Sequence, residues 1–312
     1  MTVRIATRRS ALAKWQANHV SSLLIGLEPG LDVQLLELMT RGDRILDVPL
    51  AEVGGKGLFV KEIEDALLRG DAQIAVHSMK DLPAAEPAGL VIAAVPPRED
   101  PRDALISHGK RLDQLPKGAK VGTASLRRSA QLKAMRPDLK IETIRGNVAT
   151  RLRKIDEGFD AVVLAHAGLK RLGLADKVVQ VFSTEEMLPA VAQGALAIEA
   201  RLDDVETLRR LAPLEDRTTR IQIQAERGFL RTLQGGCQVP IAGHAEVKGE
   251  RVWLRGLVAN LDGTVIIRGE RTGPATDAAQ VGEALAEELI ARGAGEILAA
   301  IEKGPGLSAP KR

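Results

Sequence analysis

The chain contains one cysteine, Cys237, in a segment whose composition could support chemistry. Glycines stand directly before it at positions 235 and 236, and Pro240 follows shortly after. Glycine leaves the backbone bare beside the sulfur and proline restrains the loop, so another molecule could approach the thiol closely. A lone cysteine is also common as a small buried apolar residue. From these residues alone, a reactive thiol and a buried one are equally open.

An ammonium group and a carboxylate follow a short apolar run at residues 74–76, which predicts a buried strand. The segment reads His77-Ser78-Met79-Lys80-Asp81-Leu82-Pro83. Ligands of α/β proteins bind at the carboxyl ends of strands, so Asp81 is well placed for catalysis. The alternative is that Asp81 caps the next turn while Lys80 is only solvated.

Arginine and small polar residues follow three further predicted strands. They are Arg8 and Ser10 after the first strand, Ser125, Arg127 and Arg128 after a strand at 120–123, and Arg145, Gly146 and Arg151 after a strand at 140–144. Backbone N–H groups at the start of a helix bind anions, and guanidinium groups grip a carboxylate in two places. Their repetition in two consecutive α/β units predicts a cleft lined for a polyanion.

Strands and helices alternate from the start of the chain to residue 199, which favours an α/β fold. Strands are expected at 3–7, 33–39, 74–76, 90–95, 120–123, 140–144, 161–165 and 196–199, and helices at 11–24 (capped by Ser10), 59–67, 126–135 and 148–157. Pro96-Pro97, followed by charged residues 98–102, predicts a hinge between domains.

The pattern changes from Thr218 onwards. A long helix to about residue 233 is followed by three strand-like runs and a helix at 278–291. Hairpin signals lie at Lys248-Gly249 and Asp262-Gly263. These features predict a smaller α+β domain.

Composition excludes several classes of protein. The 312 residues are 45% hydrophobic and 27% charged, with no apolar run long enough to span a membrane and no signal-like start. The 44 basic and 41 acidic residues leave a net charge of +3, aromatic residues are 2%, and tyrosine is absent, which argues against nucleic-acid binding. With one cysteine and no export signal, we expect a reducing cytoplasm.

Two further patterns fail on spacing. Gly54-Gly55-Lys56-Gly57 matches neither the dinucleotide fingerprint nor the Walker loop. The five histidines show no metal-ligand spacing, so no metal site is predicted. We expect His77 to be a neutral hydrogen-bonding residue.

Taken together, these segments resemble those of the porphobilinogen deaminase family, also called hydroxymethylbilane synthases. The matching segments, in the family's order, are RIATRRS (4–10), GGKGLF (54–59), HSMKDLP (77–83), GTASLRR (122–128), RGN (145–147), AGLKR (167–171) and GGCQVP (235–240). The ordered set spans nearly the whole chain and is highly specific. Two positions depart from the family pattern. Glu52 stands where lysine is common, and His166 stands where a small or apolar residue is usual, so we expect His166 to pack.

The resemblance implies three domains. Domain 1 comprises residues 1–97 and 194–213, domain 2 residues 98–193, and domain 3 residues 214–312. The first two are expected to be type II periplasmic-binding-protein-like α/β lobes, with the chain crossing back near Gln193 to complete domain 1. The third is expected to be a small α+β domain that carries the cysteine loop.

The resemblance also implies a transferase of tetrapyrrole, porphyrin and heme biosynthesis that acts as a monomer on porphobilinogen. A dipyrromethane cofactor is expected on Cys237 through a thioether, built by the enzyme from its own substrate. Four porphobilinogen molecules would condense head to tail onto it with loss of ammonia. Hydrolysis would then release the linear tetrapyrrole hydroxymethylbilane.

In this reaction, Asp81 can stabilise cations that form on the pyrroles and help to move their protons. Each pyrrole carries an acetate and a propionate, so the growing chain is a polyanion that arginines can hold. The residues implied to bind the cofactor are Cys237, Lys80, Asp81, Ser125, Arg127, Arg128 and Gly146. The residues implied to bind the substrate are Arg8, Ser10, Lys56, Phe59, Arg145, Arg151, Arg171 and Gln193.

Two alternatives rank behind this hypothesis. A non-enzymatic protein that binds an anionic solute could share the two-lobed fold, because fold does not decide function. It would carry no covalent pigment. A nucleic-acid-binding protein is suggested only by the small excess of basic residues.

Overall fold

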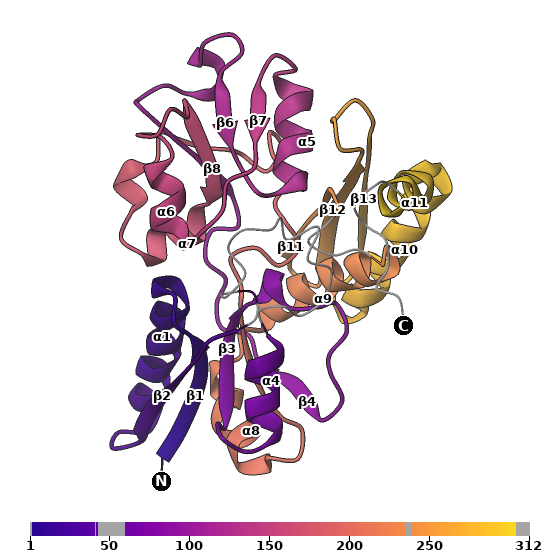
Figure 1. Cartoon of the computed structure of the whole chain (residues 1–312). Helices are drawn as coiled ribbons and strands as arrows, with labels where there is room; N and C mark the ends of the chain where they lie inside the picture. The colour runs from indigo at the N-terminus through magenta and orange to yellow at the C-terminus, as the bar shows by residue number, and fades with distance from the viewer. Residues whose placement is uncertain (1, 41, 43–59, 235–238, 304–312) are drawn as a thin grey trace. The chain divides into compact units, whose positions relative to one another are not determined.

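The computed structural model describes residues 2–40, 42, 60–234 and 239–303, and its strands form the three sheets of Figure 1. The described residues fall into two units. One contains residues 2–40, 60–99 and 194–220, and the other contains residues 100–193, 221–234 and 239–303. Four residues singled out in the sequence, Glu52, Lys56, Phe59 and Cys237, lie outside the described residues.

The first unit is built on a mixed sheet in the order β2-β1-β3-β10-β4. Its strands are β1 (Thr2–Arg8), β2 (Asp32–Leu38), β3 (Ile74–Ser78), β4 (Leu90–Ala94) and β10 (Leu196–Arg201). β1 is parallel to β2 and β3, whereas β10 is antiparallel to β3 and β4. The chain therefore crosses back after residue 193 to complete this sheet.

Helices α1 (Ala11–Leu27), α4 (Lys61–Leu68) and α8 (Val205–Leu211) pack on this sheet. Ile5 of β1 lies in one core with Val20 of α1, whereas its neighbour Ala6 lies in another with Ile63 of α4. Successive side chains of a strand point to opposite faces, so the sheet is buried on both sides. This explains why the inner strand β3 begins with an apolar run at residues 74–76, whereas β1 and the edge strand β2 alternate apolar and polar residues.

The second unit contains a sheet in the order β7-β6-β8-β5-β9. Its strands are β5 (Asp103–Ser107), β6 (Lys120–Gly122), β7 (Lys140–Glu142), β8 (Ala161–Ala165) and β9 (Gln180–Val181), and its helices are α5 (Leu126–Met135), α6 (Val148–Arg153) and α7 (His166–Arg171). β6 is parallel to β7 and β8, and β5 is antiparallel to β8 and β9. Both five-stranded sheets thus have the same order and the same antiparallel insertion, which confirms the two periplasmic-binding-protein-like α/β lobes.

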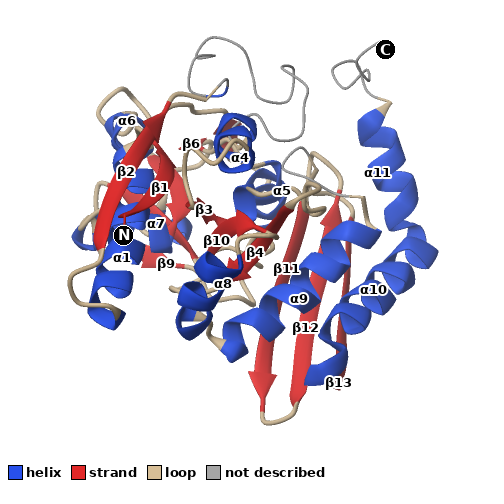
Figure 2. Ribbon diagram, turned by 90° about the horizontal axis from the view of Figure 1, so that it is seen from below, coloured by secondary structure: helices blue, strands red, loops and turns tan. Residues whose placement is uncertain are grey.

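The C-terminal part forms the antiparallel sheet β11-β12-β13. Its strands are β11 (Ile241–Lys248), β12 (Arg251–Ala259) and β13 (Ile266–Pro274), and its helices are α9 (Arg217–Thr232), α10 (Ala278–Leu289) and α11 (Gly295–Glu302). α9 and α10 lie along this sheet (Figure 2) and touch closely, since a Cβ on Gly282 would lie 2.0 Å from the carbonyl oxygen of Ala225. The α+β expectation and both predicted hairpins are confirmed.

The second α/β sheet and the C-terminal sheet share packing within their unit. Ala130 of α5 lies in one apolar cluster with Leu257 and Ala259 of β12. Gly263, at the tip of the β12–β13 hairpin, has a φ of +74°, and a Cβ there would lie 2.2 Å from the carbonyl oxygen of Ala130. Only glycine fits this approach, so the hairpin is seated directly on α5.

The structure differs from the expected elements in several places. β5 begins directly after the charged residues 98–102, where only a hinge was expected. The helix expected over 148–157 ends at Arg153, because the N–H groups of residues 154–157 donate to carbonyls three residues back rather than four. The helices α7, α8 and α11 were not predicted.

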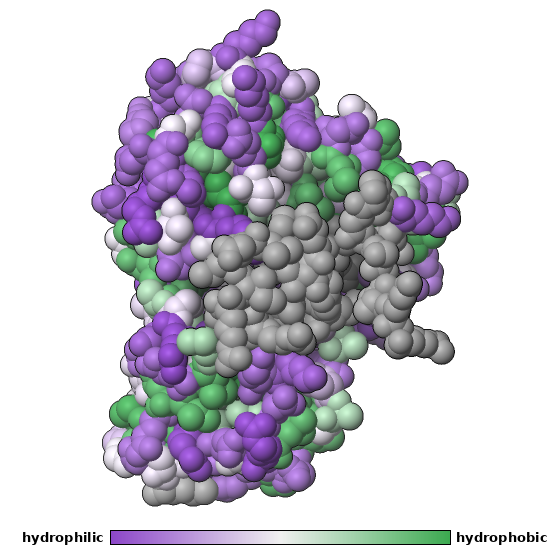
Figure 3. Space-filling model, viewed as in Figure 1, coloured by the Kyte–Doolittle hydropathy of each residue, from purple (hydrophilic) through white to green (hydrophobic). Residues whose placement is uncertain are grey.

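No helix in the described part of the chain is both long and apolar enough to cross a membrane. On the face shown in Figure 3, hydrophobic residues form separate patches among hydrophilic ones.

Candidate active site

Asp81 is held on a short turn at the carboxyl end of β3. Residues Met79–Asp81 form a single 3-10 turn closed by a hydrogen bond from the Leu82 N–H to the Met79 carbonyl at 3.1 Å. The side chains of Met79 and Leu82 are buried and anchor the turn, whereas Lys80 is half-buried and Asp81 is exposed. Asp81 makes no hydrogen bond or ion pair with the residues that the structure describes. Its carboxylate is therefore available to a ligand.

Two polar pairs hold the end of β3 just before this turn. Nε2 of His77 lies 3.2 Å from Oε2 of Glu199 on β10, and the Gln16 amide donates to Oγ of Ser78 at 2.7 Å. Glu64 of α4 interacts electrostatically with the first of these pairs. Its pKa is raised, first by burial and then by the negative charge of Glu199. The expectation that His77 forms a hydrogen bond is confirmed.

Arg8 and Ser10 lie at the same edge of the first sheet as Asp81. β1 and β3 are parallel neighbours in register at Ala6 and Ala75, so their carboxyl ends meet at one edge. Arg8 is the last residue of β1, and Ser10 caps α1 by accepting a hydrogen bond from the Ala13 N–H at 3.3 Å. The first unit therefore brings together Arg8, Ser10, Lys80 and Asp81 at one sheet edge.

The second sheet has an equivalent edge, where the carboxyl ends of the parallel strands β6, β7 and β8 meet. Ser125 follows β6 and caps α5 by accepting from the Arg128 N–H at 3.4 Å. After β7, Gly146 adopts a φ of +94°, and its carbonyl accepts from Nε of Arg151 at 2.8 Å. Arg145 precedes this turn, and Arg171 ends α7 after β8 as a buried side chain.

Arg127 and Arg128 do not line an open surface but belong to a buried ionic cluster. Nη1 of Arg127 donates to Oδ2 of Asp103 at 2.7 Å and to the Leu188 carbonyl at 2.9 Å. Nε of Arg128 donates to Oδ1 of Asp103 at 2.8 Å, and its Nη1 donates to the Val163 carbonyl at 3.2 Å.

Gln193 lies within the same cluster and is wholly buried. Its Nε2 donates to Oδ1 of Asp103 at 2.8 Å and to the Pro101 carbonyl at 2.7 Å, while its Oε1 accepts from Nη2 of Arg128 at 3.3 Å. Burial by itself would raise the pKa of Asp103, but the charges of Arg127 and Arg128 hold it well below its usual range. Asp103 is therefore ionised.

Sequence reasoning missed Asp103, the residue on which this cluster depends. It is the first residue of β5, and an aspartate that opens an apolar run was the available signal. His166 was expected to pack, but its Nδ1 lies 3.0 Å from Oδ2 of Asp100. Asp100 also accepts from Nε and Nη2 of Arg102, and these hydrogen bonds lower its pKa although burial would raise it.

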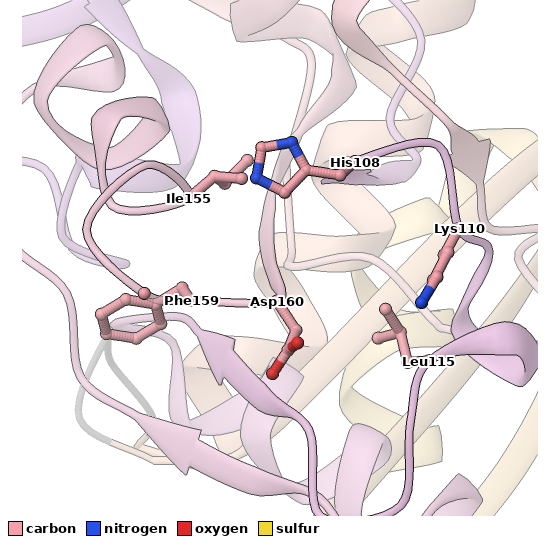
Figure 4. A pocket seen from close by; sticks show the side chains of 7 residues that line it. His108, Lys110, Leu115, Ile155, Phe159 and Asp160 are labelled. Carbon is pink, nitrogen blue, oxygen red and sulfur yellow. The ribbon is translucent and has the colours of Figure 1, made fainter.

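A surface pocket of about 300 Å³ lies elsewhere on the second unit (Figure 4). His108 follows β5 and Asp160 precedes β8, so the pocket is at the edge opposite to Ser125 and Gly146. It contains none of the residues selected from the sequence. Among the described residues, no cluster of histidine, cysteine, aspartate or glutamate could hold a metal ion.

Two family models match this chain. The model for "Porphobilinogen deaminase, dipyromethane cofactor binding domain" matches residues 3–231. The model for "Porphobilinogen deaminase, C-terminal domain" matches residues 220–291. Together the two matches cover nearly the whole chain.

Solved structures with some similarity include binding proteins. The periplasmic aliphatic sulphonate binding protein SsuA from Escherichia coli is 15% identical, with 75% of this chain and 70% of that chain covered and a TM-score of 0.39. The ligand-binding component of an ABC-type import system from Staphylococcus aureus is 12% identical, with 73% and 74% covered and a TM-score of 0.40. The Bordetella pertussis BvgS VFT2 domain is 16% identical, with 67% and 85% covered and a TM-score of 0.38. Similarity at this level carries no argument about activity.

Proposed function

The chain belongs to the porphobilinogen deaminase family, and we propose that it condenses four porphobilinogen molecules head to tail into hydroxymethylbilane. The family implies an enzyme of the transferase type that acts in porphyrin biosynthesis. The observation that carries the proposal is the match to the cofactor-binding domain over residues 3–231. A purely solute-binding function is not favoured by this match.

The described residues fit an anionic cofactor such as dipyrromethane. The carboxylates of its two pyrroles require cationic partners. Among the described residues of the second unit, Arg127 and Arg128 form ion pairs only with Asp103, and Nε of Arg127 is buried without a partner. We propose that these arginines, with Ser125, Lys80 and the backbone at Gly146, hold the cofactor. When bound, the cofactor supplies the primer to which the first pyrrole is joined.

We propose that Cys237 carries the cofactor through a thioether. A thiolate is a soft nucleophile suited to an electron-poor pyrrole methylene carbon, and the product is a stable C–S bond. This agrees with the use of a single cysteine in the chain.

Asp81 is the proposed catalytic residue. Porphobilinogen must lose ammonia to become electrophilic, and positive charge then develops on the pyrroles until a proton leaves. A carboxylate at this point stabilises each cation and accepts or returns the proton. The exposed position of Asp81 on a turn anchored by Met79 and Leu82 supports this role.

The remaining basic side chains at the two sheet edges are proposed to bind the acetate and propionate groups of the substrate and the growing chain. They are Arg8, Arg145, Arg151 and Arg171, assisted by Ser10. Lys56 and Phe59 are also proposed to bind the substrate. The three-domain division at 1–97 with 194–213, 98–193 and 214–312, the monomeric state and a cytoplasmic location stay proposals.

The test is the denatured intact mass of the purified chain beside that of a Cys237→Ser variant. We expect the native chain to exceed its sequence mass by two pyrrole units and the variant to show no excess. If the native chain shows only its sequence mass, incubation with porphobilinogen should add the missing mass. A chain that gains no mass and releases no tetrapyrrole would refute the proposal.

A further inference from the structure

The buried cluster in the second unit contains more positive than negative charge. Asp103 and Gln193 are wholly buried, and Arg127 and Arg128 are 3% and 5% exposed. The charges that act most strongly on the Asp103 carboxylate are those of these two arginines. Two guanidinium groups against one carboxylate leave a surplus of one positive charge.

Such a buried cluster of charges contributes little to the stability of the fold. Ion pairs withdrawn from water rarely improve on apolar packing, and an unmatched buried charge is costly. Nε of Arg127 adds a buried donor without a partner among the described residues. Among the described residues, the cluster is therefore incomplete in charge and in hydrogen bonding, and one bound anion would complete it.

The geometry is nevertheless tightly determined. Oδ2 of Asp103 accepts a hydrogen bond from Arg127, whereas Oδ1 accepts from both Arg128 and Gln193. Each guanidinium group is also held by a backbone carbonyl, from Leu188 for Arg127 and from Val163 for Arg128. Two or more contacts hold each guanidinium group in one orientation, and Nε of Arg127 is the buried donor of the pair that has no partner among the described residues.

Resting on the proposed function, we propose that Asp103 is a positioning residue that fixes both guanidinium groups and reduces their combined charge to one, so that the cluster binds a single carboxylate of the cofactor. The cofactor is the primer that porphobilinogen joins, so its placement is read in the KM for porphobilinogen. Gln193 belongs to the same framework, because its amide bridges Asp103 and Arg128 from a wholly buried position. The role of Gln193 is then to support the arginines rather than to touch the substrate.

Asp103→Asn is the first test, because it keeps the shape of the side chain and leaves two unmatched arginine charges. We expect the melting temperature to fall by about 10 °C and the KM for porphobilinogen to rise about tenfold. The matched control is Asp138→Asn, which neutralises the half-buried partner of Arg136, whose Nε lies 2.7 Å from Oδ1 of Asp138. The control should leave KM unchanged, because the printed hydrogen bonds of Arg136 go to Leu112, Leu115, Pro116 and Asp138 and to no residue of the cluster.

A charge-rescue variant separates positioning from charge balance. Arg127→Met makes the cluster neutral, so KM should rise while the melting temperature does not fall. Asp103→Asn combined with Arg127→Met restores a surplus of one charge and should recover at least half of the lost melting temperature. If Asp103 positions Arg128, the KM of this double variant exceeds that of Arg127→Met by about threefold or more.

Equal KM values for Arg127→Met and the double variant would overturn the proposal, even if Asp103→Asn alone fails to fold. So would a folded Asp103→Asn protein with the KM of the wild type. Failure of the proposed function looks different, since the wild-type chain would then show neither covalent pyrrole mass nor turnover.

Discussion

Replacing Asp81 by asparagine should separate catalysis from stability. The carboxylate is exposed on the turn after β3 and makes no contact with the described residues that the fold would lose. Substitutions at such positions change the free energy of unfolding by less than about 0.5 kcal/mol, so the melting temperature should move by no more than about 2 °C. Loss of a group that moves protons and stabilises cations should lower kcat by about 10²–10⁴-fold, or about 3–5 kcal/mol in activation free energy.

The assay follows release of the linear tetrapyrrole under saturating porphobilinogen, with thermal unfolding measured on the same samples. Glu86→Gln is the matched control, because Glu86 is exposed on the same loop and the change removes the same charge. The control should keep wild-type kcat. If Asp81→Asn turned over within about threefold of wild type, or if Glu86→Gln lost as much, the assignment of Asp81 as the catalytic carboxylate would be refuted.

Two further predictions concern local structure and pH. Gly146→Ala should lower the free energy of unfolding by about 2 kcal/mol or more, because its φ is +94° and a Cβ would lie 2.8 Å from Cβ of Thr150. Gly158→Ala has a φ of +95° but nothing within 4 Å of its Cβ, so urea titrations should show a smaller cost, and equal costs would contradict the steric argument. Arg255 donates a hydrogen bond to Glu185 that lowers the pKa of this carboxyl from 4.5 to about 2, so the pair stabilises the fold above about pH 4.5 and loses its contribution as the pH falls towards 2. Glu185→Gln should flatten the melting temperature across that range, and an unchanged slope would count against the pair.

Local signals were sufficient for most of the elements around the site. The helix predicted over 126–135 is α5 as observed, and Ser125 caps it. The glycines at 249 and 263 predicted both hairpins, because each adopts a positive φ that few other residues tolerate. The prediction that basic loops follow the strands also predicted that they share one edge of each sheet, since parallel strands align their carboxyl ends.

Short elements with weak local preference were missed. β5 has only five residues and follows a charged segment, so its sequence resembles the end of a hinge. It becomes a strand because it pairs with β8 and β9, and that pairing is not a local property.

The sequence by itself determined the alternation of strands and helices, the loops that carry charge and the family to which the chain belongs. Only the tertiary structure decided that Arg127 and Arg128 are buried against Asp103, and that Gln193, 90 residues after Asp103, bonds to the same carboxylate. The reason is physical. The residue type determines which charge a side chain can carry. Burial, and the partners that distant strands supply, determine whether that charge faces a ligand or another part of the chain.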